Sequence, residues 1–208
     1  MREAIAMIQA ARRPINVDEF IAKYGDGDRW ELIDGELIDM EPTGPHEQVA
    51  AFVGRKLNVE IDRDNRPYFI PYRCLINALG TDTAFRPDVV VLDQNALVKE
   101  PLWQREPVIT LGTSVKVVVE VVSTNWQNDY ARKAEDYEVL GIPEFWIVDY
   151  IGLGGKKYIG FPKQPTLSIY RLVDREYQVK QFQGSDRIES PTFPELTLTA
   201  EQIFQSGK

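Results

Sequence analysis

The stretch Val115-Lys116-Val117-Val118-Val119-Glu120-Val121-Val122-Ser123 decides how the rest of the chain is arranged. β-Branched residues at successive positions predict a strand buried on both faces, because a strand with one face in water would alternate apolar and polar residues. Glu120 falls on the same face as Val118 and Val122 and is therefore expected to point into the protein. A buried carboxylate is costly unless it is paired, protonated or bound to a metal ion. The sequence thus predicts a compensating group close to Glu120.

A second apolar strand is predicted over Phe85-Arg86-Pro87-Asp88-Val89-Val90-Val91-Leu92. It carries another acid, Asp88. Two carboxylates on adjacent strands are a common way to hold a hard divalent cation, since Mg²⁺ takes oxygen ligands and is typically bound by one or two carboxylates together with water. Asp88 and Glu120 are therefore the candidate metal ligands, with Mg²⁺ as the expected ion and Mn²⁺ as its substitute. Two structural alternatives stay open: Asp88 could cap a turn after Pro87, and a buried ion pair would equally explain Glu120.

A lysine on the next helix is the expected partner of Glu120. A helix is predicted from about Asn128 to Leu140, and one of its faces should lie on the sheet. The residues on that face are Tyr130, Lys133, Tyr137 and Leu140. Lys133 could aim its ammonium under the helix toward Glu120, where it would stabilise charge on an attacked phosphate. The alternative is an ordinary surface ion pair of Lys133 with Asp129 or Asp136.

The other patterns predict one mixed α/β domain over residues 1–208, with a core over about residues 30–205. A buried strand at Glu144–Asp149 follows the helix, and the strand–helix–strand order predicts a right-handed crossover and a parallel pair. The remaining expected elements are an N-terminal helical extension within residues 1–28, a hairpin at Trp30–Met40 around Asp34-Gly35, a helix at His46–Arg63, a strand at Pro67–Ile76, a C-terminal antiparallel annex formed by Thr166–Val173 and Tyr177–Gln183, and a last helical turn at Ala200–Gln205.

Composition limits the class of protein. The chain has 208 residues, of which 43% are hydrophobic and 27% charged, as in ordinary globular proteins. No run reaches the ~20 apolar residues of a membrane helix. Met1–Arg13 lacks the apolar block of a signal peptide, and the single Cys74 excludes an internal disulfide, so we expect a cytoplasmic protein without a membrane partner. The net charge of −8 predicts no broad basic surface for a nucleic-acid duplex.

Several short motifs, taken in order, resemble the Uma2 family of restriction endonucleases within the PD-(D/E)XK superfamily. They are Glu31-Leu32-Ile33-Asp34-Gly35-Glu36, Gly44-Pro45-His46, Arg86-Pro87-Asp88-Val89, Val119-Glu120-Val121-Val122-Ser123, Tyr137, and Gly141-Ile142-Pro143-Glu144-Phe145-Trp146-Ile147-Val148-Asp149. The resemblance implies a restriction-endonuclease-like core, a mixed central sheet flanked by helices, with Asp88 and Glu120 as its two acids. The family's usual lysine, two positions after the second acid, is Val122 here, and the resemblance implies that Lys133 replaces it. Glu36 and His46 match further polar positions and are secondary candidates for the same cleft.

These observations lead to competing hypotheses of function. The first is a Mg²⁺-dependent endonuclease that hydrolyses phosphodiester bonds of nucleic acid, with DNA expected before RNA and, by analogy, a homodimer that cuts both strands. The second is a catalytically inactive binding or regulatory module on the same fold, favoured by the acidic charge and by Val122. A third, proton transfer by the same acids without a metal, needs a raised pKa on one of them. For His46 and Glu36 the structural alternatives are a solvated first-turn residue of a helix and a turn-flanking residue.

Overall fold

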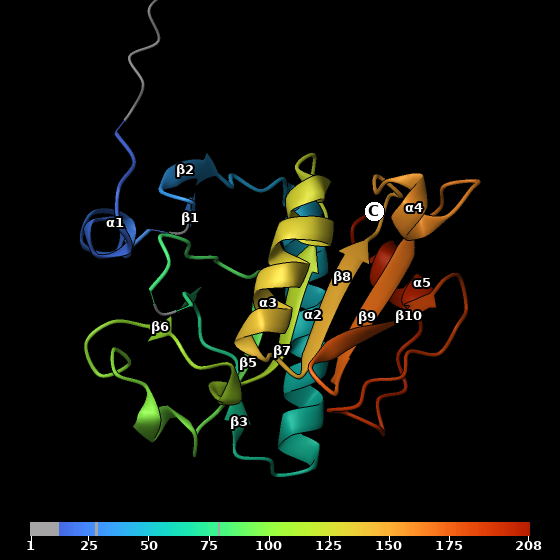
Figure 1. Cartoon of the computed structure of the whole chain (residues 1–208). Helices are drawn as coiled ribbons and strands as arrows, with labels where there is room; N and C mark the ends of the chain where they lie inside the picture. The colour runs from blue at the N-terminus through green and yellow to red at the C-terminus, as the bar shows by residue number, and fades with distance from the viewer. Residues whose placement is uncertain (1–12, 28, 79) are drawn as a thin grey trace, which may run out of the picture.

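The computed structural model describes residues 13–27, 29–78 and 80–208, and its centre is a six-stranded mixed sheet in the order β10-β9-β8-β7-β5-β3 (Figure 1). Strand β7 (Val115–Val121) runs antiparallel to β5 (Val89–Asp93) and parallel to β8 (Glu144–Asp149). The predicted neighbourhood of the two valine-rich strands and the predicted parallel pair are both confirmed. The mixed α/β fold with a central sheet flanked by helices is confirmed as well.

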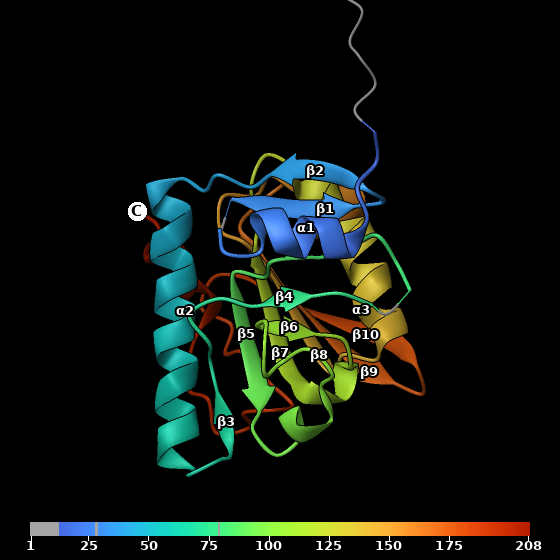
Figure 2. The ribbon, with the colours of Figure 1, turned by 90° about the vertical axis from the view of Figure 1, so that its left-hand side faces the viewer.

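Helices cover both faces of this sheet, as Figure 2 shows edge-on. Helix α2 (Gly44–Arg63) covers one face, and helix α3 (Ala134–Leu140) covers the other together with the preceding π-helical turn η3 (Asn128–Lys133). Alternate residues of β7 enter the two cores: Val117, Val119 and Val121 pack on the α2 side, and Val118 packs on the α3 side. Because both faces are covered, the strand is apolar at every position except those of Glu120 and the half-buried Lys116 near its beginning.

The N-terminal part of the described chain forms a small unit at one end of the sheet (Figures 1 and 2). It consists of α1 (Val17–Tyr24), capped by Asn16, and of the hairpin β1 (Trp30–Ile33) and β2 (Glu36–Asp39). At the hairpin turn Asp34 and Gly35 have φ of 50° and 80°, the left-handed conformation that a tight two-residue turn requires. Residues 1–12 and 28 of the predicted helical extension lie outside the described residues.

Two predicted strand regions differ in detail. The strand expected at Pro67–Ile76 is two short strands in different sheets: β3 (Tyr68–Phe69) pairs with β5, whereas β4 (Leu75–Ile76) pairs with β6 (Val108–Ile109). Pro71 lies between them and has no N–H to continue a ladder. The C-terminal hairpin, β9 (Thr166–Val173) and β10 (Glu176–Phe182), is joined to β8, so it extends the central sheet.

The remaining elements are short. They are η1 (Leu97–Lys99), η2 (Gly112–Ser114), α4 (Lys156–Ile159) and α5 (Ala200–Gln205), the last of which packs on the α2 side of the sheet through Ile203 and Phe204. The predicted helical turn at Ala200–Gln205 is thereby confirmed. Over the described residues, no helix combines the length and the apolar character that a membrane crossing requires.

Candidate functional site

The end of β7 opens into a cleft of about 630 Å³, which Asp88, Glu120 and Asp129 line together with His46. The pairing of β5 with β7 brings Asp88 and Glu120 to the same end of the sheet. Asp88 immediately precedes β5, and because β5 and β7 are antiparallel with Val89 opposite Val119, the beginning of β5 lies beside the end of β7. Asp88 is fixed there because its Oδ2 accepts the backbone N–H of Val121 at 2.6 Å.

Glu120 is almost completely buried, and its two carboxylate oxygens have different partners. Oε2 lies 3.0 Å from the ammonium nitrogen of Lys133, and Oε1 accepts a hydrogen bond of 2.8 Å from the hydroxyl of Tyr137. The helix periodicity therefore placed Lys133 and Tyr137 on the correct face. Burial raises the pKa of the Glu120 carboxyl well above its ordinary value, although the nearby ammonium opposes this rise.

Lys133 is fully buried and contacts three carboxylates. Its Nζ lies 3.0 Å from Glu120, 3.1 Å from Glu31 and 3.4 Å from Asp129. Burial alone would lower the pKa of the ammonium, but the surrounding carboxylates outweigh it and raise that pKa well above its ordinary value. Burial also raises the pKa of Asp129 to about 6, against the influence of Lys133. The contact with Glu120 is a hydrogen bond that the ammonium donates, and the contacts with Glu31 and Asp129 are ion pairs.

Of the two surface ion pairs predicted as the alternative for Lys133, the pair with Asp129 forms but is buried, and the pair with Asp136 is wrong. Asp129 is buried with Lys133, because the wider π-helical turn directs both side chains toward the sheet. Asp136 instead accepts from Nε of Arg132 at 2.7 Å. Arg132 also binds the hairpin turn, through contacts of 2.6 and 2.7 Å to the carboxylate of Asp34. Arg132 thereby ties η3 to the hairpin that carries Glu31.

Glu31 is the site residue that the sequence reasoning missed. It lies in β1 with no exposed surface, and its Oε1 accepts the backbone N–H of Arg86 at 2.8 Å in addition to the Lys133 contact. Its Oε2 is buried and has no hydrogen-bond partner among the described residues. Glu36, which was predicted instead, is exposed at the beginning of β2 and is not among the residues lining the cleft. The available signal was that Glu31 stands inside an apolar strand whereas Glu36 flanks the turn.

His46 lies in the first turn of α2 and is buried, so the alternative of a solvated first-turn residue is wrong. Its Nε2 is 2.9 Å from the carbonyl oxygen of Val121 and 3.4 Å from Oδ2 of Asp88. Its Nδ1 has no hydrogen-bond partner within the described part of the chain. Burial works to lower the pKa of His46, but Asp88 and the Val121 carbonyl outweigh it and raise that pKa. Two acceptors at Nε2 indicate that this nitrogen carries a proton.

The donors of this cleft fit a hard divalent cation. Four carboxylates interact with one another around a single ammonium, which leaves a formal charge of −3 when all are ionised; they are Glu31, Asp88, Glu120 and Asp129. Among residues 13–27, 29–78 and 80–208, no three or more Asp, Glu, His or Cys side chains are grouped to hold one ion together. The oxygen donors therefore suit an ion that keeps most of its waters, as Mg²⁺ does, and do not form a complete protein cage.

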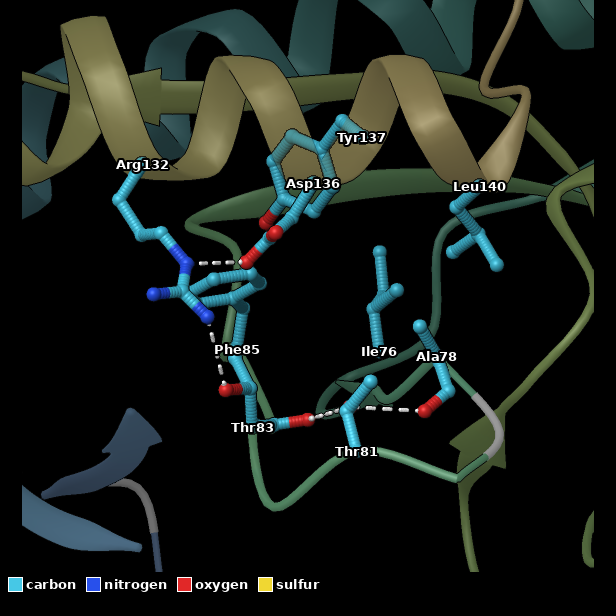
Figure 3. Close-up of a pocket in the computed structure, with 9 residues that line it drawn as sticks. All are labelled: Ile76, Ala78, Thr81, Thr83, Phe85, Arg132, Asp136, Tyr137 and Leu140. Carbon is cyan, nitrogen blue, oxygen red and sulfur yellow. Dashed lines mark hydrogen bonds and ion pairs between the residues drawn. The ribbon is translucent and has the colours of Figure 1, made fainter. Parts of the chain in front are cut away.

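A second, smaller pocket lies beside α3, and Figure 3 shows its lining. Arg132 and Asp136 stand at one side of it, near Thr83, and Ile76 and Leu140 close the other. Its volume is about 30 Å³, enough for about one water molecule. We therefore assign it a structural role and place the functional site in the larger cleft.

Comparisons with known proteins agree with this architecture. The family model Uma2, described as "Putative restriction endonuclease", matches residues 17–201. Among solved structures, the chain is similar to the crystal structure of "a putative nuclease belonging to DUF820" from Anabaena variabilis ATCC 29413, with a TM-score of 0.68 and 19% sequence identity over 94% of this chain and 100% of that chain. At this identity the likeness establishes the shared fold. No curated protein matches the chain.

Proposed function

Because the chain belongs to the Uma2 family, whose description is "Putative restriction endonuclease", we propose that it is a divalent-metal-dependent nuclease that hydrolyses phosphodiester bonds of nucleic acid, with DNA as the first substrate to test. The observation that carries the proposal is the meeting of three groups at the end of β7. Glu120 contacts Lys133 at 3.0 Å, and Asp88 lines the same cleft one strand away. In this proposal the catalytic lysine comes from η3, and Val122 is a buried residue of the α3-side core.

Each side chain has a distinct task in this proposal. Asp88 and Glu120 would hold Mg²⁺ or Mn²⁺, which when bound polarises a phosphoryl oxygen and lowers the pKa of a coordinated water. His46 positions Asp88 through Nε2, and Tyr137 orients the carboxylate of Glu120. Lys133 donates to the attacking water or to the phosphate. Since Lys133 donates a hydrogen bond to Glu120 and forms ion pairs with Glu31 and Asp129, one of those contacts must lengthen before Lys133 can act on substrate.

The same closed network favours a second candidate, a catalytically inactive binding or regulatory module. Both oxygens of Glu120 have protein partners, and Lys133 already supplies a cation to the carboxylates. If these contacts persist when a divalent ion is supplied, Glu120 and Lys133 serve only to stabilise the fold. Binding of the ion separates the two candidates, because only the nuclease requires it.

The decisive experiment combines Mn²⁺ calorimetry with a cleavage assay on plasmid and oligonucleotide substrates. We expect wild-type protein to bind the ion, at least with an oligonucleotide present, and to cleave only when the ion is supplied. Glu120→Gln keeps the shape and removes the charge, and it should lower cleavage by about 100-fold or more. Glu135→Gln, the same substitution at an exposed position of α3, is the matched control and should leave both readouts unchanged. Undiminished cleavage by Glu120→Gln would contradict the proposal, and absence of ion binding would favour the binding module.

A further inference from the structure

Tyr72 stands fully exposed at the cleft. It lies in the short segment between β3 and β4, and it is counted among the residues lining the same cleft as Asp88 and Glu120. Within the described residues Tyr72 makes no hydrogen bond, ion pair or ring contact. The segment on either side is nevertheless anchored, because Pro71 restricts the backbone and Cys74 is buried in the α3-side core. The ring is thus presented to solvent by a fixed segment.

Among the described residues, Tyr72 is the exposed aromatic side chain of this cleft. The large apolar side chains that are exposed in the described chain are Val59, Tyr72, Val98, Val139, Ile151, Phe161 and Val179. Of these, Tyr72 and Ile151 line the cleft, and Tyr72 is the aromatic one. An aromatic face held open beside a candidate nuclease site is suited to stacking on a base, and Ile151 adds a further apolar surface to the same cleft.

The charges of the cleft argue against recognition through phosphates. Its lining includes seven carboxylates, which are Asp26, Asp39, Glu41, Glu47, Asp88, Glu120 and Asp129, against three arginines. The arginines are already engaged: Arg29 binds Asp39 at 2.8 Å, Arg73 binds the backbone carbonyl and carboxylate of Asp26, and Arg86 binds backbone carbonyls. A duplex presents two phosphate backbones. Most of the non-specific affinity of a protein for a duplex comes from cationic lysine and arginine side chains that are free to neutralise phosphates. Stacking does not depend on such cations.

We propose that Tyr72 is the stacking platform for an unpaired nucleobase, and that the substrate class of this site is single-stranded nucleic acid. The proposal rests on the proposed nuclease function and narrows it. Only an unpaired base offers an open face to an aromatic side chain, because the bases of a duplex are covered by their neighbours. A single strand also brings fewer phosphates to the acidic cleft than a duplex of equal length does.

Fluorescence anisotropy of a labelled 15-nucleotide strand tests this without requiring cleavage. The titrations use the full chain with Ca²⁺ and, in parallel, with EDTA, and the same strand annealed to its complement provides the duplex. We expect the single strand to bind more tightly than the duplex. Tyr72→Ala should weaken single-strand binding by about tenfold, whereas Tyr72→Phe, which keeps the ring, should bind as the wild type does.

Phe161→Ala is the matched control, since Phe161 is an exposed aromatic outside the cleft lining and its loss should not change binding. Equal single-strand affinity of Tyr72→Ala and wild type would overturn the proposal while leaving the nuclease function intact. An equal or higher affinity for the duplex would do the same. If neither nucleic acid binds any variant under either condition, the stacking proposal and the nuclease function fall together. A thermal unfolding curve for each variant shows that the fold is retained.

Discussion

Replacing Asp129 by asparagine should change the stability in a pH-dependent way. The free energy of unfolding of Asp129→Asn, relative to that of wild type, should be higher at neutral pH than at acid pH. Asp129 is buried beside Lys133, with 3.4 Å between Oδ1 and Nζ. Burial is the largest influence on its pKa, which is raised to about 6 from 3.8; Asp88 and Glu31 add to the rise and Lys133 opposes it. Asparagine keeps the size of the side chain and removes the ionisation. The comparison of the two proteins across pH therefore isolates the contribution of this carboxyl.

The sign follows from proton linkage. A group whose pKa is higher in the folded state binds its proton more tightly when folded, so its stabilising contribution is complete below about pH 3.8 and is lost as the pH rises through about 6. A difference of about two pKa units corresponds to about 3 kcal/mol of unfolding free energy. We expect the free energy of unfolding of Asp129→Asn, minus that of wild type, to increase by about 2–3 kcal/mol between about pH 4.5 and about pH 7.5.

Urea unfolding followed by tryptophan fluorescence, at a series of pH values with EDTA present, measures this difference. Asp34→Asn is a control of opposite sign, because the pKa of Asp34 is lowered by its hydrogen bonds to Arg132, so its contribution is lost as the pH falls. A difference that does not change with pH would refute the reasoning, since it would mean that Lys133 fully compensates the burial of Asp129. Addition of Mg²⁺ should reduce the deficit of wild type at neutral pH if the cleft binds the ion.

Two further substitutions test the packing around the site. Lys133→Met leaves three buried carboxylates without their cation and should lower the free energy of unfolding by about 3–5 kcal/mol at neutral pH. The loss should be smaller at acid pH, where the carboxylates are protonated. Urea unfolding at neutral and acid pH measures both values, and a small loss that does not depend on pH would contradict the interaction of Lys133 with these carboxylates. Gly112→Ala places a Cβ 2.1 Å from the backbone carbonyl oxygen of Leu140 and should destabilise by more than about 2 kcal/mol. Gly44→Ala, whose Cβ meets nothing within 4 Å, should change thermal stability little, and equal effects of the two would show that the close approach is relieved by a local shift.

Some features of this protein follow from local sequence. The valine run defines β7 because consecutive β-branched residues fit a strand covered on both faces, and the period of two then fixes the direction of Glu120. The helical period likewise places Lys133 and Tyr137 on one face. Asp34-Gly35 defines a hairpin turn, since few residue pairs accept positive φ at both positions. Each of these is decided within about ten residues of chain.

Beyond the pair of Glu120 and Lys133, which the sequence predicts, tertiary structure decided which charges meet. Glu31 and Glu36 occupy the same short hairpin, yet Glu31 is buried against Lys133 and Arg86, whereas Glu36 remains in solvent. Asp129 had the spacing of a surface ion-pair partner and is instead buried. In each case the outcome depends on which distant segment covers the side chain: Arg132 binds Asp34 from 98 residues away. Sequence periodicity gives the direction of a side chain, but burial and charge compensation depend on what packs against it.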